Sequence, residues 1–410
     1  MTHLTRRTLL AAAPAALAFG GPVLAPWPAR AKEYGPGVTD HEIKIGNSAA
    51  YSGPASSYGT IPKCEAAYFK MINEQGGVNG RKINFISYDD AYSPPKTFEM
   101  TRKLVEEDGV FLIFNTLGTP TNTVIWRYMN QHKIPQLFVG TGATKWDDPK
   151  GHPWTIGWQP SYQAEGRIYA AYTLAHKPDA VVGVLYQDDD FGKDYMKGVA
   201  DGFGAKAASM IKVRATYETT DTTVDSQIVQ MKAAGCNVII NCAIQKFAAQ
   251  AIKKAAEIEW KPLHILSGIG SSVAGTLRPA GLANCKGIIS DFFLKDPTDP
   301  VWHDDAGYKW WLGFMDKYYP DGDKKDGSNA YAPSVAATLI QVFKQCGNEL
   351  TRENVMKQAA HLNLTVPMLL PGMRITTSPT DFAPVKQVQM GRFDGERWRL
   401  FGPLLKGSIS

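Results

Sequence analysis

The sequence contains few of the residues on which most catalytic and metal sites depend. It has five cysteines in 410 residues with no C-x-x-C pair, and its eight histidines include no H-E-x-x-H spacing. These absences argue against the common thiol-redox and zinc motifs. No G-x-S-x-G turn occurs either, so the nucleophile of that class of hydrolase is missing. The sequence therefore predicts no cofactor, no metal ion and no enzymatic chemistry.

Charge of one sign is also scarce. There is no run of five basic residues, and without Arg6, Arg7 and Arg30 the net charge falls from +5 to about +2. A nearly neutral chain has little electrostatic attraction to nucleic acid, so we expect no nucleic-acid partner. The acidic run Asp188 to Asp190 precedes a helix-like segment, where carboxylates serve as caps more often than as metal ligands. We expect buried free thiols at Cys64, Cys236, Cys242, Cys285 and Cys346.

The first 31 residues have the features of an export signal. A twin arginine, Arg6-Arg7, precedes a short Ala/Leu-rich stretch, and Ala29-Arg30-Ala31 fits an A-x-A cleavage site. Prolines and glycines interrupt the stretch, which makes it a poor membrane anchor. No cysteine lies near the cleavage site, which argues against a lipid anchor. We expect residues 1–31 to be a twin-arginine signal peptide and the mature chain, residues 32–410, to be soluble in the periplasm.

Strand-like and helix-like segments alternate through most of the remaining chain. A first series runs from the strand-like residues 42–49 to 134–141, and a second from the helical pattern at 161–177 to the strand-like 262–268. Such alternation predicts parallel sheets with helices on both faces, and two series predict two α/β lobes. Residues 385–402 predict a β-hairpin that turns at Asp394-Gly395.

The turn at NTLGTPTNTV, Asn115 to Val124, lies between a buried strand-like run and a helix-like segment. Free backbone N–H groups and the positive end of a helix dipole meet at such a turn and favour an anion. This turn offers threonine hydroxyls, including that of Thr119, but no lysine. It therefore predicts an anion of low charge that dipoles and hydroxyl groups hold without a cation.

Four blocks of the sequence carry a resemblance to a known family. They are SAAYSGPASSYG at 48–59, INEQGGVNGRKI at 72–83, LGTPTN at 117–122 and DDFGKDYMKG at 189–198. Together they resemble the leucine/isoleucine/valine-binding proteins, the periplasmic solute receptors of ABC importers. The resemblance implies a type I periplasmic binding fold, in which two doubly wound parallel-sheet lobes are joined by a hinge. It also implies a monomer, a small ligand and a membrane permease as partner.

The family's ligand positions can be placed on this sequence residue by residue. The resemblance implies that Thr119, Gly142 and Thr144 of the first lobe hold a ligand carboxylate and that Tyr58 covers the ligand. It implies a first lobe of residues 32–158 plus about 290–350, and a second of residues 159–289 plus about 351–410. The anion expected at the turn is then a single carboxylate.

Two departures from the family concern the second lobe. Where amino-acid receptors place a tyrosine and a glutamate, this sequence has Phe191 and Phe247, and the neighbours Gln245 and Lys246 carry no negative charge either. A ligand ammonium would then be buried without a partner, whereas two phenylalanines offer flat walls for a ring. The departures predict an aromatic or apolar carboxylate such as a benzoate or phenylpropenoate. The ring substituents of such a ligand could meet two polar side chains, those of Gln159 and Ser271.

Three alternatives remain open on the sequence. A branched-chain amino-acid receptor would need a carboxylate near the ligand, which the fold could supply from Asp225 or Asp291. A sensor-associated binding protein would use the same closed form, and only neighbouring genes would distinguish it. A periplasmic enzyme is the weakest alternative, because no nucleophile–base pair is visible in the sequence.

Overall fold

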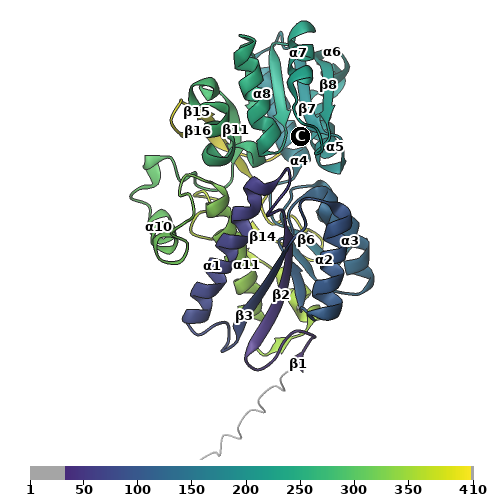
Figure 1. The fold of residues 1–410 in the computed structure, drawn as a ribbon, viewed down its shortest axis with the longest axis vertical. Helices are drawn as coiled ribbons and strands as arrows, with labels where there is room; N and C mark the ends of the chain where they lie inside the picture. Colours follow the sequence, from purple (N-terminus) through teal and green to yellow (C-terminus); the bar gives the residue numbers. More distant parts are fainter. Residues whose placement is uncertain (1–32, 408–410) are drawn as a thin grey trace, which may run out of the picture.

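The computed structural model describes residues 33–407 and shows two α/β lobes stacked along the long axis of the molecule (Figure 1). The expected signal peptide, residues 1–31, lies outside the described residues. Each lobe contains one sheet whose strands are all or mostly parallel, with helices packed on it. This confirms the fold class predicted from the sequence. Within residues 33–407, no helix is both long and apolar enough to cross a membrane.

The first lobe is built on a five-stranded parallel sheet in the order β3-β2-β4-β5-β6. The central strand β4 and its neighbour β5 are buried along their whole length, as expected for near-continuous apolar runs in a sheet covered on both faces. The bounds of the strands are β2 (Glu42–Ala49), β3 (Lys82–Asp89), β4 (Leu112–Phe114), β5 (Gln136–Val139) and β6 (Thr155–Gly157).

Helices cover both faces of this sheet. α1 (Thr60–Glu74) and α11 (Ser328–Cys346) pack against each other on one face, whereas α2 (Pro94–Arg102) and α3 (Thr119–Gln131) pack together on the other. α10 (Ala306–Tyr318) lies on the outer side of α1 (Figure 1). The first lobe therefore combines the first half of the sequence with helices that come much later in the chain.

The second lobe contains a seven-stranded mixed sheet in the order β16-β15-β11-β10-β9-β7-β8. The strands from β11 to β8 are parallel, and the C-terminal hairpin joins β11 in the antiparallel direction. The hairpin turns at Asp394-Gly395 as predicted, with Gly395 at φ +112°. The strands are β7 (Val182–Gln187), β8 (Ile211–Tyr217), β9 (Val238–Cys242), β10 (Leu263–Leu266), β11 (Ile289–Phe292), β15 (Val388–Phe393) and β16 (Trp398–Leu405).

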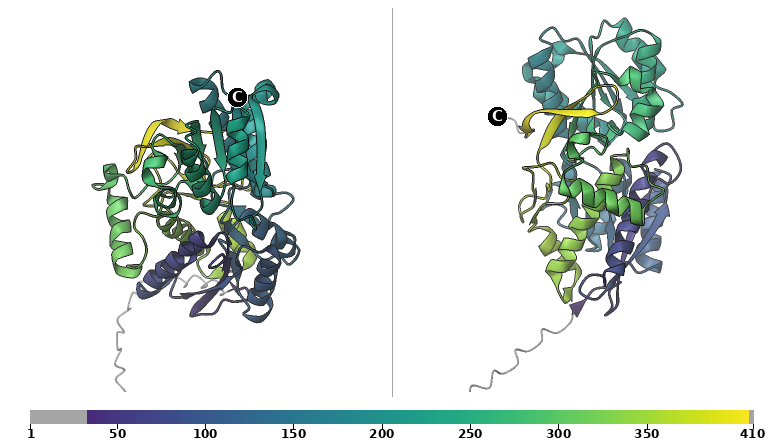
Figure 2. Two further views of the ribbon diagram at one scale, coloured as in Figure 1. Left: turned by 45° about the horizontal axis from the view of Figure 1, so that its top comes forward. Right: turned by 90° about the vertical axis from the view of Figure 1, so that its left-hand side faces the viewer.

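Two pairs of helices pack on this second sheet. α4 (Tyr162–His176) packs on α5 (Asp190–Phe203), and α7 (Asp225–Ala233) packs on α8 (Gln245–Glu257). The right-hand view of Figure 2 shows the yellow β15–β16 hairpin along the flank of this lobe. The last strands of the chain therefore complete the second lobe.

The lobe boundaries differ from those expected at about 290 and 351. β11 (Ile289–Phe292) still belongs to the second sheet, whereas α12 (Arg352–Ala359) packs on α11 of the first lobe. Arg352 donates from Nε to Phe111 O at 2.8 Å and from Nη2 to Val110 O at 3.0 Å. Residues from 351 to just before β15 therefore extend the first lobe, because their buried side chains cover it.

The chain crosses between the lobes after β6, after β11 and before β15. The first two crossovers lie against each other, since the rings of Trp158 and Phe293 meet edge to face with centroids 5.8 Å apart. Trp158 is fully buried and its indole N–H donates to Thr338 Oγ1 at 3.0 Å. These contacts fix the crossovers at the back of the space between the lobes.

Candidate ligand-binding site

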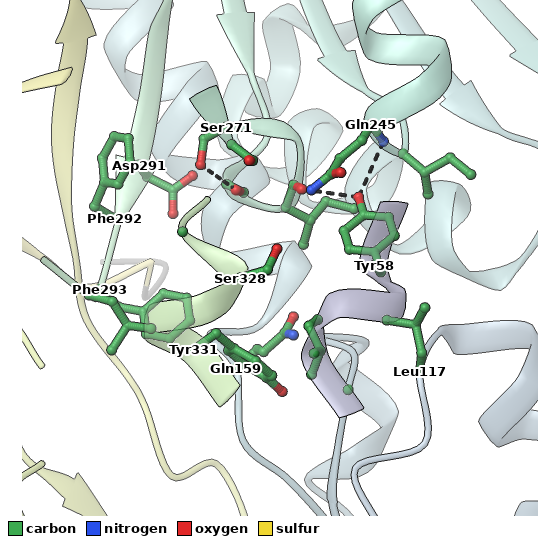
Figure 3. A pocket seen from close by; sticks show the side chains of 18 of the residues that line it. Tyr58, Leu117, Gln159, Gln245, Ser271, Asp291, Phe292, Phe293, Ser328 and Tyr331 are labelled. Carbon is green, nitrogen blue, oxygen red and sulfur yellow. Dashed lines mark hydrogen bonds between the residues drawn. The ribbon is translucent and has the colours of Figure 1, made fainter. Parts of the chain in front are cut away.

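A cavity of about 140 Å³ lies between the two lobes (Figure 3). Its lining residues come from the segments that follow each of the strands β2 to β6 in the first lobe, from the start of α11, and from the ends of β7, β9, β10 and β11 and the segments after them in the second lobe. The carboxyl ends of parallel strands are the usual place for a ligand in α/β proteins. Much of the wall consists of aromatic rings, those of Tyr58, Tyr92, Tyr162, Phe191, Phe292, Phe293 and Tyr331.

The cavity lining includes five of the residues predicted to contact the ligand, namely Tyr58, Thr119, Gln159, Phe191 and Ser271. Gln159 comes from the first crossover, and the Ser271 hydroxyl donates to Gly268 O at 2.7 Å. Ligand contact by these residues stays a prediction. The other three predicted residues lie outside the lining; they are Gly142, Thr144 and Phe247.

The start of α3 forms the polar part of the first-lobe wall. Gly118 has φ +94°, and a Cβ at this position would lie 2.4 Å from the Tyr92 ring, so only glycine lets the ring lie so close. Thr119, the first residue of α3, is almost fully buried, and its Oγ1 lies 2.6 Å from Thr141 Oγ1. A helix N-terminus with hydroxyl groups in this position attracts a carboxylate.

Tyr58 connects the two lobes across the cavity. Its hydroxyl donates to Ile269 O at 3.1 Å and accepts from the backbone N–H of Gln245 at 3.2 Å. Figure 3 shows both bonds as dashed lines. Because Tyr58 belongs to the first lobe and its partners to the second, these bonds exist only when the lobes are closed.

We expect Tyr58→Phe to lower ligand affinity by about ten-fold, because closing the lobes would leave the Gln245 N–H and the Ile269 carbonyl unpaired. Titration calorimetry gives the affinity, and small-angle scattering with ligand gives the closed fraction. Tyr88→Phe is a matched control, because the Tyr88 hydroxyl bonds Asp108 within the first lobe at 2.9 Å. Equal affinity of Tyr58→Phe and the control would show that these cross-lobe bonds do not stabilise the closed form.

Thr144 and Gly142 are engaged by other parts of the chain. The Thr144 N–H and hydroxyl donate to Asp194 Oδ2 of α5 at 2.8 and 2.9 Å. A Cβ at Gly142 would lie 2.2 Å from Pro160 O, so the backbone there is closely packed. In the closed form, the Asp194 carboxylate of the second lobe therefore accepts hydrogen bonds from the N–H and hydroxyl groups of Thr144. These are the groups that were expected to bind the ligand carboxylate.

Phe191 and Phe247 lie in different surroundings. Phe191 opens α5, lines the cavity and contacts the Tyr162 ring edge to face, with centroids 5.3 Å apart. Phe247 is fully buried against Tyr217, with centroids 4.3 Å apart, and the cavity is lined instead by Ile244 and Gln245. The placement of Phe247 at the ligand is therefore wrong, because its position on α8 points it into the lobe's own core.

Three acidic residues line the cavity: Glu165 of α4, Asp291 of β11 and Asp296, which follows β11 in the chain. The sequence left open whether the fold brings a carboxyl group to the second-lobe wall, and the structure places Glu165 and Asp291 there. Asp291 is one of the two acids that the amino-acid alternative required, whereas the other, Asp225, lies outside the lining on α7 and 3.4 Å from Lys254 Nζ. An acid inside the apolar run GIISDFF was the signal in the sequence that could have identified this site.

Two of these acids, Glu165 and Asp291, belong to one buried hydrogen-bond cluster. The Tyr169 hydroxyl lies between Glu165 Oε2 and Asp291 Oδ1, and Tyr195 donates to Glu165. Burial raises the pKa of both carboxyl groups above their usual range, and in Glu165 the neighbouring Asp291 raises it further. Of the two Asp291 oxygens, Oδ2 is fully buried and has no hydrogen-bond partner among residues 33–407.

The remaining expectations about metal ligands and thiols concern residues outside the cavity. Asp189 caps α5 by accepting from the N–H groups of Phe191 and Gly192, which confirms its reading as a cap. All five cysteines are free and buried, as expected. Among residues 33–407, no cluster of three or more histidine, cysteine or acidic side chains could hold a metal ion.

Residues 42–397 match the sequence profile of the family described as periplasmic binding protein. The chain belongs to this family. Leu/Ile/Val-binding protein homolog 1 of Brucella abortus (strain 2308) is 24% identical to this periplasmic binding protein over 323 residues, which cover 76% of the chain and 81% of the relative. The receptor type predicted from the resemblance is confirmed at the level of the family.

Solved structures show the same fold. A branched chain amino acid ABC transporter protein from Thermus thermophilus with bound valine has a TM-score of 0.79 at 16% identity, covering 90% of this chain and 97% of that one. A fatty acid ABC transporter substrate-binding protein from Thermomonospora curvata has a TM-score of 0.77 at 18% identity, covering 92% and 95%. These likenesses show that the present protein shares the fold of these structures.

Proposed function

We propose that this chain captures a small aromatic carboxylate between its lobes and delivers it to the permease of an ABC importer of the branched-chain-amino-acid type. The observation that carries the proposal is the cavity wall. The start of α3 with Thr119 offers a site for one carboxylate, and aromatic rings make up much of the remaining surface. The family and its named relatives support the transport role.

The size of the cavity agrees with a ligand that contains one ring. Its volume is about 140 Å³. An apolar protein cavity of roughly 150 Å³ is known to bind benzene. Among the similar folds, one structure holds valine and another belongs to a fatty acid transporter. The fold alone therefore does not determine whether the ligand carries an ammonium group. The residues of the cavity wall determine it.

A thermal-shift screen of the mature protein tests the proposal. Benzoates, phenylpropenoates, leucine and valine are compared at equal concentration. A ligand present at 100 times its dissociation constant adds about 2.7 kcal/mol to the free energy of unfolding. We expect stabilisation by at least one aromatic acid and none by the amino acids. Stabilisation by amino acids alone would overturn the proposed ligand class.

We expect Thr119→Val to lower affinity for the carboxylate ligand about ten-fold. Valine keeps the shape of the side chain but removes a hydrogen bond to a charged group, worth ~1.5–3 kcal/mol. Thr101→Val is the matched control, since Thr101 on α2 is equally buried, its hydroxyl has no partner, and it does not line the cavity. Titration calorimetry compares the two variants. An unchanged affinity in Thr119→Val would place the anion elsewhere.

A second candidate function is a receptor for an amino acid. The presence of Asp291 and Glu165 in the cavity favours it, because a ligand ammonium could pair with either carboxylate. The two candidates make opposite predictions for the ligand series above. Loss of leucine binding in an Asp291→Ala variant, with no aromatic acid bound by either protein, would establish the second.

A further inference from the structure

Two ion pairs join the lobes outside the cavity. Lys145 follows β5 in the first lobe, and its Nζ lies 2.6 Å from Asp190 Oδ2 at the start of α5. Arg278 of α9 (Arg278–Ala280) belongs to the second lobe, and its Nη1 lies 2.9 Å from Asp323 Oδ2, between α10 and α11 of the first. The other ion pairs among residues 33–407 each lie within one lobe.

The two pairs lie on different sides of the molecule. Lys145 also donates to Thr123 Oγ1 of α3 at 2.6 Å, and α3 and α5 lie on the right of Figure 1. Asp323 follows α10, which lies on the left. Each lobe contributes the cation of one pair and the acid of the other. Closing the lobes therefore brings unlike charges together on both sides.

Beside each ion pair, a second carboxylate accepts hydrogen bonds from the opposite lobe. Asp194 of α5 accepts from the N–H and the hydroxyl of Thr144 at 2.8 and 2.9 Å. The other oxygen of Asp194 accepts from Gln163 Nε2 at 2.6 Å, which fixes the carboxylate in this orientation. On the other side, Asp326 just before α11 accepts from the hydroxyl of Ser272 at 2.9 Å. Hydrogen bonds to a charged acceptor are stronger than those between neutral groups.

These contacts require nothing from a ligand, because the chain supplies every donor and acceptor. Of the residues that cross between the lobes in this way, only Ser272 lines the cavity. Contacts that form on closure shift the equilibrium between the open and closed forms whether or not a ligand is bound. A ligand that touches both lobes binds most tightly to the closed form, so its apparent affinity rises with the closed fraction.

The two ion pairs are accessible to salt. The side chains of Asp190, Arg278 and Asp323 are between 43% and 58% exposed. Dissolved ions screen exposed charges, so each pair stabilises closure less at high ionic strength. An exposed pair of this kind changes an equilibrium by up to about five-fold.

We propose that these contacts form a salt-sensitive latch that holds much of the ligand-free protein closed at low ionic strength. The proposal goes beyond the proposed function, since it holds for either ligand class. It also implies that salt lowers ligand affinity without touching any ligand contact. The residues of the latch are Thr144, Lys145, Asp190, Asp194, Ser272, Arg278, Asp323 and Asp326.

Small-angle scattering of the purified protein without ligand tests the latch, with about 20 and about 500 mM NaCl as the only additive. We expect a larger radius of gyration at the higher salt concentration. The double variant Asp190→Asn/Asp323→Asn should be more open at low salt and should respond less to salt. Asp188→Asn and Asp316→Asn are matched controls, because their carboxylates pair with lysines of their own lobe. They should behave like the wild type.

Exchanging the charges of one pair separates attraction from a general effect of mutation. Asp190→Lys alone places two cations together and should open the protein at low salt. Adding Lys145→Glu restores unlike charges and should recover closure and its salt dependence. Thermal unfolding checks that each variant is folded. A wild-type radius of gyration that salt does not change, or a double variant as open as Asp190→Lys, would overturn the latch. Either result would leave the proposed function standing.

Discussion

Calorimetry of the purified protein is expected to show binding of an aromatic acid at least a hundred-fold more tightly than leucine. The reason is the distribution of groups around the cavity. Leucine carries its ammonium on the carbon next to its carboxylate. With that carboxylate at the start of α3, the ammonium would lie on the Leu117 side of the cavity, across from Asp291 (Figure 3).

The magnitude follows from two effects of the same sign. A ring that stacks on Phe191 or its aromatic neighbours gains ~0.5–1.5 kcal/mol beyond its buried area. A neutral polar group that is buried without a partner loses ~2–7 kcal/mol, and an ammonium group loses more than a neutral group does. Together with the gain from the ring, this loss exceeds the ~2.8 kcal/mol that corresponds to a hundred-fold difference in affinity. Leucine, phenylalanine, benzoate and coumarate are the ligands to compare.

Two phenylalanine variants test the cause of this preference. Phe191→Leu removes a ring from the cavity wall and should reduce the preference for the aromatic acid several-fold. Phe247→Leu is its matched control, because Phe247 is equally buried but packs on Tyr217 outside the lining. An equal effect of both variants would indicate a general loss of packing. Tight leucine binding without detectable aromatic-acid binding in the wild type would falsify the prediction.

The second large effect concerns export. We expect replacement of Arg6 and Arg7 by lysine to leave nearly all of the protein as precursor in the cytoplasm. A twin-arginine signal is read through the paired guanidinium groups, which lysine does not reproduce. Arg30→Lys, within the same expected signal peptide, is the control and should be exported normally. Cell fractionation with immunodetection measures the result, and periplasmic mature protein at the wild-type level in the twin-lysine variant would refute this route.

Much of the fold followed from local sequence patterns. The strand at 42–49 and the hairpin turning at Asp394-Gly395 were predicted with their observed positions, because side-chain periodicity and turn residues act over a few neighbours. The start of α3 was predicted as a polar wall for the same reason, since a strand, a glycine and a helix N-terminus are consecutive in the chain. Thr119 does line the cavity.

Other features depended on which distant segments meet. The sequence placed Phe247 at the ligand, but one turn of α8 decides whether a side chain points into the cleft or into the lobe, and α8 turns Phe247 towards Tyr217. Likewise Thr144 was expected to bind the ligand, whereas closure brings Asp194 of the other lobe onto its N–H and hydroxyl. Such contacts cannot be read from spacing along the chain.

Local patterns were enough to predict two α/β lobes, the order of strands and helices along the chain, and a hydroxyl-rich helix start suited to one carboxylate. Two features became visible only in the folded chain: residues after 351 extend the first lobe, and Glu165 and Asp291 share one buried cluster at the cavity wall. Residues 165 and 291 lie on a helix and a strand that are far apart in the chain. Their meeting is set by the packing of α4 beside the end of β11, which long-range burial rather than local pattern controls.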